Sequence, residues 1–191
     1  MTGDLDHRRA AAIARRRRVE PADRLHQSSA IAERVVATDW YRRSEAIGLY
    51  LATGGEIDPA PIGEHVRRRG ASTWYPVMAE DDGPMRFRRW DGDAPLQPGT
   101  LGIPLPPRAE ECTGADLDAV LVPVVLFGRD GVRIGRGGGH YDRTFANRSQ
   151  AGRPHVLCGL AYDFQEDESL TAEPWDVPVD EVITPSRTLT W

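Results

Sequence analysis

The stretch GVRIGRGGGHYDR, residues 131–143, combines residue types that bind an anion. Four glycines lie between positions 135 and 139, and Arg133 and Arg136 are interleaved with them. Glycines let the backbone approach a ligand and adopt positive φ, so that its N–H groups can point at an anion. Arginines pair with phosphate oxygens in a bidentate manner. Asp142 follows directly and suits a Mg²⁺ ion held by that phosphate.

Two common phosphate-binding motifs do not fit this stretch. A Walker A loop continues into Lys-Ser/Thr, and this chain has no lysine, since all 24 of its basic residues are arginine. A dinucleotide-binding fingerprint needs a third glycine where His140 stands. A purely structural turn is the alternative, and the adjoining arginines and Asp142 weigh against it.

Composition limits the class of protein. The chain has 191 residues with 40% hydrophobic and 28% charged residues, which suits one soluble domain of ordinary size. No run approaches 18 apolar residues and the N-terminus is charged, so we expect neither a membrane partner nor a secretory signal. Cys112 and Cys158 lack metal-ligand spacing and predict free thiols in a cytoplasmic protein. We expect a monomer.

The four consecutive arginines at positions 15–18 raise the question of nucleic-acid binding. On a helix their side chains point all round the axis, and acidic residues flank them, so we interpret the run as a solvated helix surface. The net charge of −5 also argues against a nucleic-acid partner.

The chemistry-bearing segments must be positioned by alternating strands and helices. We therefore predict an α/β fold in which a mainly parallel sheet is covered by helices on both faces, as a single domain over 1–191. Residues 1–40 are expected to form helices that pack on this core. The glycine stretch would follow the central strand and open a helix, at the carboxyl ends of the strands where α/β sheets bind ligands. The expected elements are helices over 4–18, 21–38, 59–69 and 140–150, and strands over 46–52, 72–78, 85–90, 118–127, 155–162 and 180–184, with a loop over 91–115.

Three segments resemble the 5-formyltetrahydrofolate cyclo-ligase (methenyltetrahydrofolate synthetase) family. The most specific is DAVLVPVVLFGRDGVRIGRGGGHYDR, in which residues 133–142 fill the family frame Arg-Leu-Gly-x-Gly-x-Gly-x-Tyr-Asp. IGLYLATGGEID resembles a family strand followed by Glu-Ile-Asp, and PWDVPVDEVIT resembles the C-terminal Trp/His-Asp motif. In order and spacing the resemblance covers nearly the whole chain.

The resemblance implies a ligase that closes 5-formyltetrahydrofolate to 5,10-methenyltetrahydrofolate while ATP is split to ADP and phosphate, with Mg²⁺. In such enzymes the formyl oxygen attacks the γ-phosphate, N10 attacks the activated carbon, and phosphate leaves. The protein then has mainly to position groups and neutralise charge.

The family's functional residues carry over by position, as implications of the resemblance. Arg136 and Tyr141 would be catalytic, and Asp142 and Asp176 would hold Mg²⁺. Glu56 would hydrogen-bond the pterin ring of the folate. The nucleotide would contact Arg9, Arg133, Ile134, Gly135, Arg136, Gly137, Gly138, Gly139, His140 and Tyr141. The folate would contact Glu56, Arg136, Gly137, Gly138, Gly139 and His140.

Each acidic assignment has a structural alternative. Glu56 would otherwise be an ordinary loop acid, Asp176 a turn cap, and Asp142 a charge at a helix start. Three aromatic residues, Trp74, Tyr75 and Trp90, are candidates for stacking on the pterin, although strand aromatics more often belong to the core.

The chain departs from the family pattern at three places, one of which is His140, where the family often has an aromatic residue before Tyr-Asp. The N-terminal Lys-x-x-x-Arg that reaches the ATP phosphates aligns with Leu5 and Arg9, which leaves Arg8 as the candidate replacement for the lysine. In the segment 102–106, Leu105 stands at a polar position of the family. A diverged paralogue that binds folate or nucleotide without turnover is therefore the alternative, and an RNA-associated protein using the arginine-rich N-terminus is a third.

Overall fold

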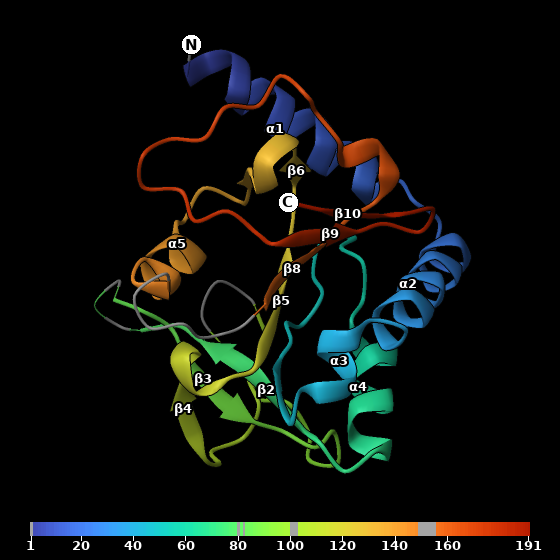
Figure 1. The fold of residues 1–191 in the computed structure, drawn as a ribbon, viewed down its shortest axis with the longest axis vertical. Helices are drawn as coiled ribbons and strands as arrows, with labels where there is room; N and C mark the ends of the chain where they lie inside the picture. The colour runs from blue at the N-terminus through green and yellow to red at the C-terminus, as the bar shows by residue number, and fades with distance from the viewer. Residues whose placement is uncertain (1, 80, 82, 100–102, 149–155) are drawn as a thin grey trace.

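The computed structural model describes residues 2–79, 81, 83–99, 103–148 and 156–191, and in them one mixed sheet organises the chain (Figure 1). Its eight strands lie in the order β10-β9-β8-β5-β1-β2-β3-β4. The strands are β1 Ala46–Gly48, β2 Ser72–Val77, β3 Arg86–Arg89, β4 Glu111–Thr113, β5 Ala119–Pro123, β8 Val156–Leu160, β9 Glu181–Ile183 and β10 Thr188–Thr190.

The centre of the sheet is parallel and its edges are antiparallel. Strands β2, β1, β5, β8 and β9 run in one direction, whereas β3, β4 and β10 run against their neighbours. Residues 120–122 of β5 are completely buried, as the continuous apolar run predicts for a strand covered on both faces. The predicted mainly parallel α/β fold is thus confirmed.

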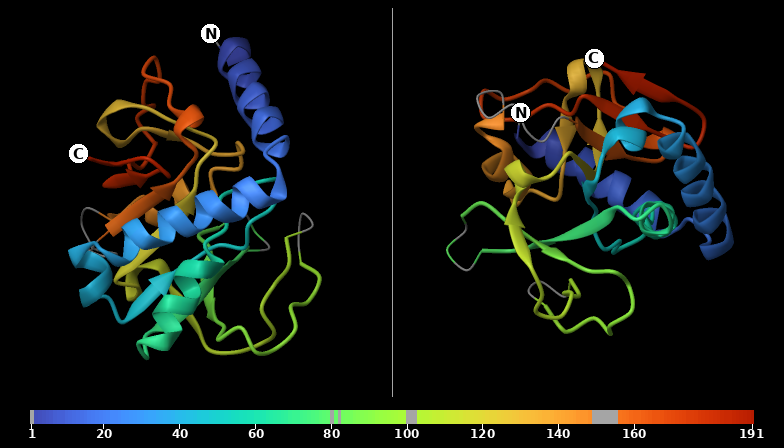
Figure 2. Two further views of the ribbon diagram at one scale, coloured as in Figure 1. Left: turned by 90° about the vertical axis from the view of Figure 1, so that its right-hand side faces the viewer. Right: turned by 60° about the horizontal axis from the view of Figure 1, so that its bottom comes forward.

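Helices cover the two faces of the sheet unequally. Three helices, α2 Pro21–Val36, α3 Asp39–Arg43 and α4 Ala60–Arg68, contribute to one apolar core with strand residues such as Ile47 and Leu121 (Figure 2). On the opposite face the short helix α5, His140–Phe145, inserts Phe145 into a second core with Phe87 and Val120. Loops complete that second face, which leaves room for a cavity beside α5.

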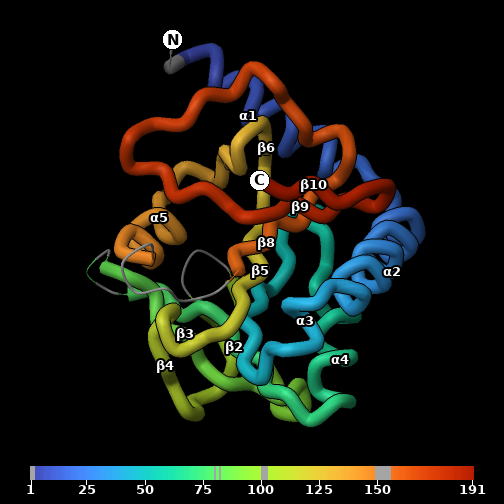
Figure 3. The backbone as a smooth tube through the Cα atoms, in the orientation of Figure 1, coloured from blue at the N-terminus to red at the C-terminus, as the bar shows by residue number. Residues whose placement is uncertain are grey.

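The first helix, α1 Thr2–Arg17, packs against the end of the structure that holds the glycine stretch. Its Ala12 joins a third apolar cluster with Leu126 and Ile134. Figure 3 shows the segment that connects η4 (Asp163–Gln165) to β9. It passes over α1 and then near α5 before it reaches β9. None of the helices in the described ranges has the length and apolar character to cross a bilayer.

The predicted strand over 118–127 divides in two. Strand β5 ends at Pro123, which has no N–H to continue the ladder, and the chain leaves the main sheet there. Residues Leu126–Phe127 (β6) then pair antiparallel with Arg133–Ile134 (β7) in a separate ribbon, with the short helix η3 (Arg129–Gly131) as the turn. The glycines at positions 135–139 therefore follow β7 and not the central strand directly.

Other sequence-based boundaries also need correction. The strand predicted over 46–52 is regular only in β1, and the helix predicted over 140–150 ends at Phe145. The predictions for 149–150 and for His155 fall outside the described residues. The sequence analysis missed α3, β4, β10 and the short helix η2 (Gly114–Asp116), all of which are three to five residues long and carry too few residues for a periodic signal.

Candidate functional site

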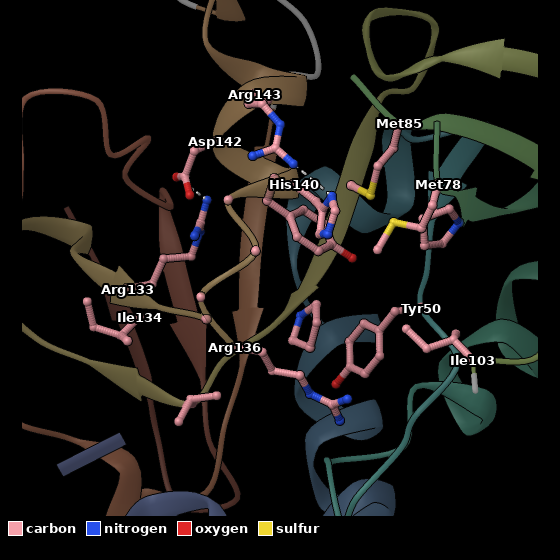
Figure 4. Close-up of a pocket in the computed structure, with 18 of the residues that line it drawn as sticks. Tyr50, Met78, Met85, Ile103, Arg133, Ile134, Arg136, His140, Asp142 and Arg143 are labelled. Carbon is pink, nitrogen blue, oxygen red and sulfur yellow. Dashed lines mark hydrogen bonds and ion pairs between the residues drawn. The ribbon is translucent and has the colours of Figure 1, made fainter. Parts of the chain in front are cut away.

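A cavity of about 620 Å³ opens where the carboxyl ends of β1, β2 and β5 meet (Figure 4). This volume is in the range of small-molecule sites. The residues that the family resemblance assigned to nucleotide, folate or Mg²⁺ all lie in its lining, whereas Arg8 and the three aromatic candidates do not. The assigned residues are Arg9, Glu56, Arg133, Ile134, Gly135, Arg136, Gly137, Gly138, Gly139, His140, Tyr141, Asp142 and Asp176.

The cavity has two chemically different walls. In Figure 4 Tyr50, Met78, Met85 and Ile103 lie on one side, which we name the apolar wall; Leu105 also lines the cavity. On the other side Figure 4 shows Arg133 and Ile134, and the glycine loop, residues 135–139, also lines the cavity. An apolar surface facing a cationic loop suits a ligand pair in which a planar ring system meets a phosphate chain.

The glycine loop combines left-handed backbone conformations with open space around some of its residues. Gly137 has φ +100° and Gly139 has φ +63°, conformations that disfavour other residues. A Cβ atom built at Gly135 or Gly137 would meet nothing within 4 Å. These two positions therefore have open space around them, as backbone that must contact a ligand requires. The predicted helix start after the loop is confirmed, since α5 begins at His140.

Arg133 and Asp142 form the best-buried ion pair of the glycine stretch. The Arg133 guanidinium donates to Asp142 Oδ1 at 2.8 Å, and the Arg133 side chain is only 6% exposed. The Val177 N–H donates to the same oxygen at 3.1 Å. This arrangement ties β7, α5 and the C-terminal segment together beneath the loop. It also fixes the direction in which Asp142 presents its second oxygen.

Asp176 enters the cavity from the C-terminal segment. Its Oδ2 accepts from the Glu173 N–H at 2.8 Å, so it does close a turn, as the structural alternative proposed. In the described part of the chain the hydrogen bonds of Asp142 use Oδ1 and those of Asp176 use Oδ2. One oxygen of each remains for a cation. Hard carboxylate oxygens fit Mg²⁺, which takes one or two protein carboxylates and completes its shell with phosphate and water.

Glu56 is more than an ordinary loop acid. Its side chain is 6% exposed, yet it lines the cavity. The Thr53 N–H donates to Oε2 at 2.9 Å, and Arg136 Nη2 lies 2.9 Å from Oε1. Arg136 in turn donates to Thr53 Oγ1 at 2.6 Å. The turn after β1 and the glycine loop are therefore held to each other by the two residues predicted to contact folate and phosphate.

The interpretation of the arginine run as entirely solvated is wrong at one position. Arg16 is 1% exposed, and its Nη2 lies 3.5 Å from Glu56 Oε1, whereas Arg15, Arg17 and Arg18 are exposed. Sequence reasoning missed Arg16 because four identical residues look alike. The available signal was helical spacing, since position 16 shares a face of α1 with Leu5, Arg9 and Ala12.

Arg8 and Arg9 point to different parts of the structure, because neighbouring residues on a helix lie about 100° apart around its axis. Arg9 lines the cavity and donates from Nε to the Gly135 carbonyl at 3.1 Å. Arg8 points elsewhere and donates to Asp167 Oδ2 at 2.7 Å and to Ser169 Oγ at 2.6 Å. Leu5 packs on the apolar cluster around Ala12. The hypothesis that Arg8 replaces the family's lysine is therefore not supported by its position.

The aromatic candidates for pterin stacking belong to the core. Trp74 and Tyr75 are buried, and Trp90 packs edge-on against Tyr75 with ring centroids 5.2 Å apart. None of the three is among the described residues that line the cavity. Of the tryptophans, Trp175 does line it and is largely exposed. Gly102, from the segment that diverges from the family, lies outside the described residues.

Burial favours the protonated form of the two tyrosines at the cavity. Burial raises the pKa of Tyr141 above its ordinary value, and the nearby Glu56 charge adds to that effect. Burial likewise raises the pKa of Tyr50, whose hydroxyl donates to the Ile57 carbonyl at 2.7 Å. Both side chains are therefore neutral phenols near pH 7. Such a group donates a hydrogen bond and does not act as a base.

The chain is similar to cyclo-ligases and to a methenyltetrahydrofolate synthetase over most of its length. A 5-formyltetrahydrofolate cyclo-ligase of Escherichia coli K12 is 30% identical over 180 residues, which cover 93% of this chain and 98% of that protein. A cyclo-ligase of Mycolicibacterium smegmatis is 32% identical over 149 residues, 72% of each chain. The solution structure of Aquifex aeolicus 5,10-methenyltetrahydrofolate synthetase superposes with a TM-score of 0.82 at 26% identity, covering 97% of this chain and 91% of that one. Because the sequence profile of the 5-formyltetrahydrofolate cyclo-ligase family also matches residues 4–185, this chain belongs to that family.

Proposed function

We propose that this protein closes 5-formyltetrahydrofolate to 5,10-methenyltetrahydrofolate and splits ATP to ADP and phosphate. The observation that carries the proposal is that one cavity is lined by both the glycine loop and Glu56, and that Arg136 of the loop pairs with Glu56. A reaction between a folate and a phosphate chain needs the two to meet in one place. Family membership supports the same activity.

The apolar wall and Glu56 suit the folate. Met78, Met85 and Leu105 offer a surface for a flat ring, and sulfur contacts with aromatic rings are favourable. A pterin carries adjacent N–H donors that a carboxylate can accept as a pair. Glu56 is held by its bond from the Thr53 N–H, so its position is set before the folate arrives. This fixes the ring and, through it, the formyl oxygen.

The glycine loop and its arginines suit the triphosphate. Open backbone at Gly135 and Gly137 admits phosphate oxygens, and Arg9, Arg133 and Arg136 supply positive charge beside them. The formyl oxygen attacks the γ-phosphorus, ADP departs, N10 attacks the activated carbon and loses its proton, and phosphate leaves. Arg136 is placed to stabilise the charge on the transferred phosphoryl group. Tyr141 can donate a hydrogen bond there as a neutral phenol.

Asp142 and Asp176 are the residues that would hold Mg²⁺. A bound Mg²⁺ neutralises phosphate charge and orients the chain of phosphates. Arg133 has a separate role here, because its ion pair fixes Asp142 and so the direction of the carboxylate. Arg9 anchors the start of the glycine loop through the Gly135 carbonyl. These protein contacts set the position of the triphosphate relative to the folate.

The direct test is a turnover assay on the purified protein. The protein is mixed with 5-formyltetrahydrofolate, Mg²⁺ and ATP, and the absorbance of the methenyl product is followed together with released phosphate. We expect one phosphate for each methenyl group formed. Arg136→Gln should lose most of this activity, whereas Arg129→Gln, a matched change at an exposed arginine paired with Glu168, should keep it.

Two other outcomes have distinct meanings. Folate binding without methenyl formation would favour a diverged paralogue, consistent with Leu5 in place of the family's lysine. Absence of both binding and turnover would reject the proposed function. Retention on RNA that weakens with salt would instead support the nucleic-acid alternative.

A further inference from the structure

Arg16 is a buried cation beside the cavity that the reaction described above does not use. It is 1% exposed, and it comes from the last turn of α1. Its Nε donates to the Gly54 carbonyl at 3.2 Å and its Nη1 to the Val124 carbonyl at 3.3 Å. Its Nη2 lies 3.5 Å from Glu56 Oε1. The three nitrogens of one guanidinium therefore reach two segments, the turn that holds Gly54 and Glu56 and the chain at Val124 just after β5.

Near this contact the backbone of the turn at Gly55 packs closely against the end of α1. Gly55 has φ +81°, and a Cβ atom there would lie 2.7 Å from the Arg16 carbonyl oxygen. Only glycine allows the turn that carries Glu56 to pack directly on the end of α1. The carbonyl of Gly55 also accepts from the Tyr162 hydroxyl at 3.0 Å. This turn is thus held from both sides, and Arg16 is the charged part of that support.

Two arginines that differ in exposure lie beside the Glu56 carboxylate. Arg136 lies on the glycine loop with a side chain 45% exposed, whereas the Arg16 side chain is 1% exposed. Burial lowers the pKa of Arg16, and the negative charge of Glu56 opposes this shift. The Arg16 guanidinium nevertheless stays charged, because the pKa of arginine is very high. If Arg136 turns toward a phosphate, Arg16 stays as the cation beside a nearly buried carboxylate. An unpaired buried carboxylate would otherwise be costly.

We infer that Arg16 is a positioning residue for the folate: it holds the Glu56 carboxylate in place while Arg136 engages the phosphate. The inference rests on the proposed function. Helical geometry extends it, because Arg9 and Arg16 lie about two turns apart on one face of α1. Arg9 contacts the glycine loop at Gly135 and Arg16 contacts the turn of Glu56. The first helix thereby holds the nucleotide side and the folate side at a set separation.

Equilibrium binding of 5-formyltetrahydrofolate in the presence of Mg²⁺ and a saturating non-hydrolysable ATP analogue tests this inference, because Arg136 then engages the phosphate. The proteins are wild type, Arg16→Gln, Arg16→Lys, Glu56→Gln and the double variant Arg16→Gln/Glu56→Gln. Arg18→Gln is the control, because it makes the same charge change at an exposed arginine two positions along. Circular dichroism melting establishes that each variant is folded. Affinity for ATP-Mg²⁺ is measured in parallel.

We expect Arg16→Gln to weaken folate binding about tenfold or more, the usual effect of losing a charged hydrogen-bond partner. Its affinity for ATP-Mg²⁺ should stay within about twofold of wild type, which a general loss of structure would not produce. Arg16→Lys keeps the charge and should recover part of the folate affinity. The double variant should bind no more weakly than Glu56→Gln alone, because the two residues act as one unit.

Several results would overturn the inference. If Arg16→Gln and Arg18→Gln bind folate with the same affinity, Arg16 does not position the folate. The same conclusion follows if the losses of affinity in Arg16→Gln and Glu56→Gln add up in the double variant. If neither Arg16 variant folds under conditions where Arg18→Gln does, Arg16 serves stability and not folate binding. If wild type binds no folate, the proposed function fails and this inference fails with it; if wild type turns over normally, only this inference is at stake.

Discussion

The Arg136 guanidinium lies 2.9 Å from the Glu56 carboxylate, so the residue expected to bind phosphate is paired with the residue expected to bind folate. If both residues bind their ligands as proposed, each ligand has to compete with this ion pair. We then expect the first ligand to break the pair and to leave the residue that binds the second ligand free of it. Thermodynamic reciprocity requires such coupling to be equal in both directions.

This relationship predicts positive coupling between folate and nucleotide. We expect saturating 5-formyltetrahydrofolate to tighten binding of a non-hydrolysable ATP analogue about fivefold or more, within the usual range for coupled sites. Calorimetric titrations with and without folate measure the ratio. In Glu56→Gln the ratio should fall toward one. An unchanged ratio in that variant would mean that the ion pair does not link the two ligands.

Asp142→Asn should raise the Mg²⁺ concentration needed for turnover by on the order of tenfold or more, because a neutral amide is a poor ligand for a hard cation. The fold should survive, since the amide oxygen can still accept from Arg133 and from the Val177 N–H. The measurement is a Mg²⁺ titration of the initial rate, with Asp93→Asn, an exposed loop acid, as the control. A Mg²⁺ dependence like that of wild type would leave Asp142 only its structural role at the start of α5.

Gly137→Ala and Gly70→Ala form a matched pair. Gly137 has φ +100° and Gly70 has φ +84°, and a Cβ atom at either position meets nothing within 4 Å. Both substitutions should therefore cost a similar amount of stability, roughly 1–2 kcal/mol of backbone strain. Only Gly137 lies in the cavity, so only Gly137→Ala should reduce the rise in melting temperature caused by ATP-Mg²⁺. For wild type, nucleotide at about 100 times its Kd should add roughly 2.7 kcal/mol. Equal nucleotide responses in the two variants would argue against phosphate binding by the glycine loop.

Arg9→Ala should raise the KM for ATP about tenfold or more, the cost of a lost charged contact. Arg8→Ala should leave that KM nearly unchanged, because Arg8 pairs with Asp4 and Asp167 instead of lining the cavity. Steady-state kinetics on the two variants separates the residues. A large effect of Arg8→Ala alone would restore Arg8 as the replacement for the family's lysine.

The pair of Arg8 and Asp167 predicts a loss of stability in acid. Burial raises the pKa of Asp167, but hydrogen bonds from Ser169 and the charge of Arg8 outweigh it, so the pKa lies below its ordinary value of 3.8. A carboxyl group with a lowered folded-state pKa stabilises the fold above that ordinary value, and the contribution disappears as the pH falls below it. Urea unfolding of wild type and Arg8→Ala between about pH 6 and pH 3 should show their stability difference shrinking toward low pH. A difference that grows in acid would mean that the pair does not lower this pKa.

Local sequence was sufficient for the main elements, whereas Glu56 and Asp176 were assigned through the resemblance to the cyclo-ligase family. Apolar runs such as 119–123 and amphipathic helices such as 21–36 carry enough residues for a periodic signal. The glycine loop could also be predicted, because its conformations depend on the absence of side chains at those positions. Short elements such as β4 depend on pairing with a partner strand, which no local pattern encodes.

Identical residue types show what only the tertiary structure decided. Arg8 and Arg9 are neighbours in sequence, yet one binds the 167–169 turn and the other the glycine loop, since a helix turns by about 100° between them. Residues 15–18 are all arginines and chemically the same, but of the four only Arg16 becomes buried, with its guanidinium beside Glu56. The residue types and their spacing determined which groups were available for phosphate, cation and folate. Which guanidinium meets which carboxylate depended on packing, because burial and pairing arise from contacts between segments far apart along the chain.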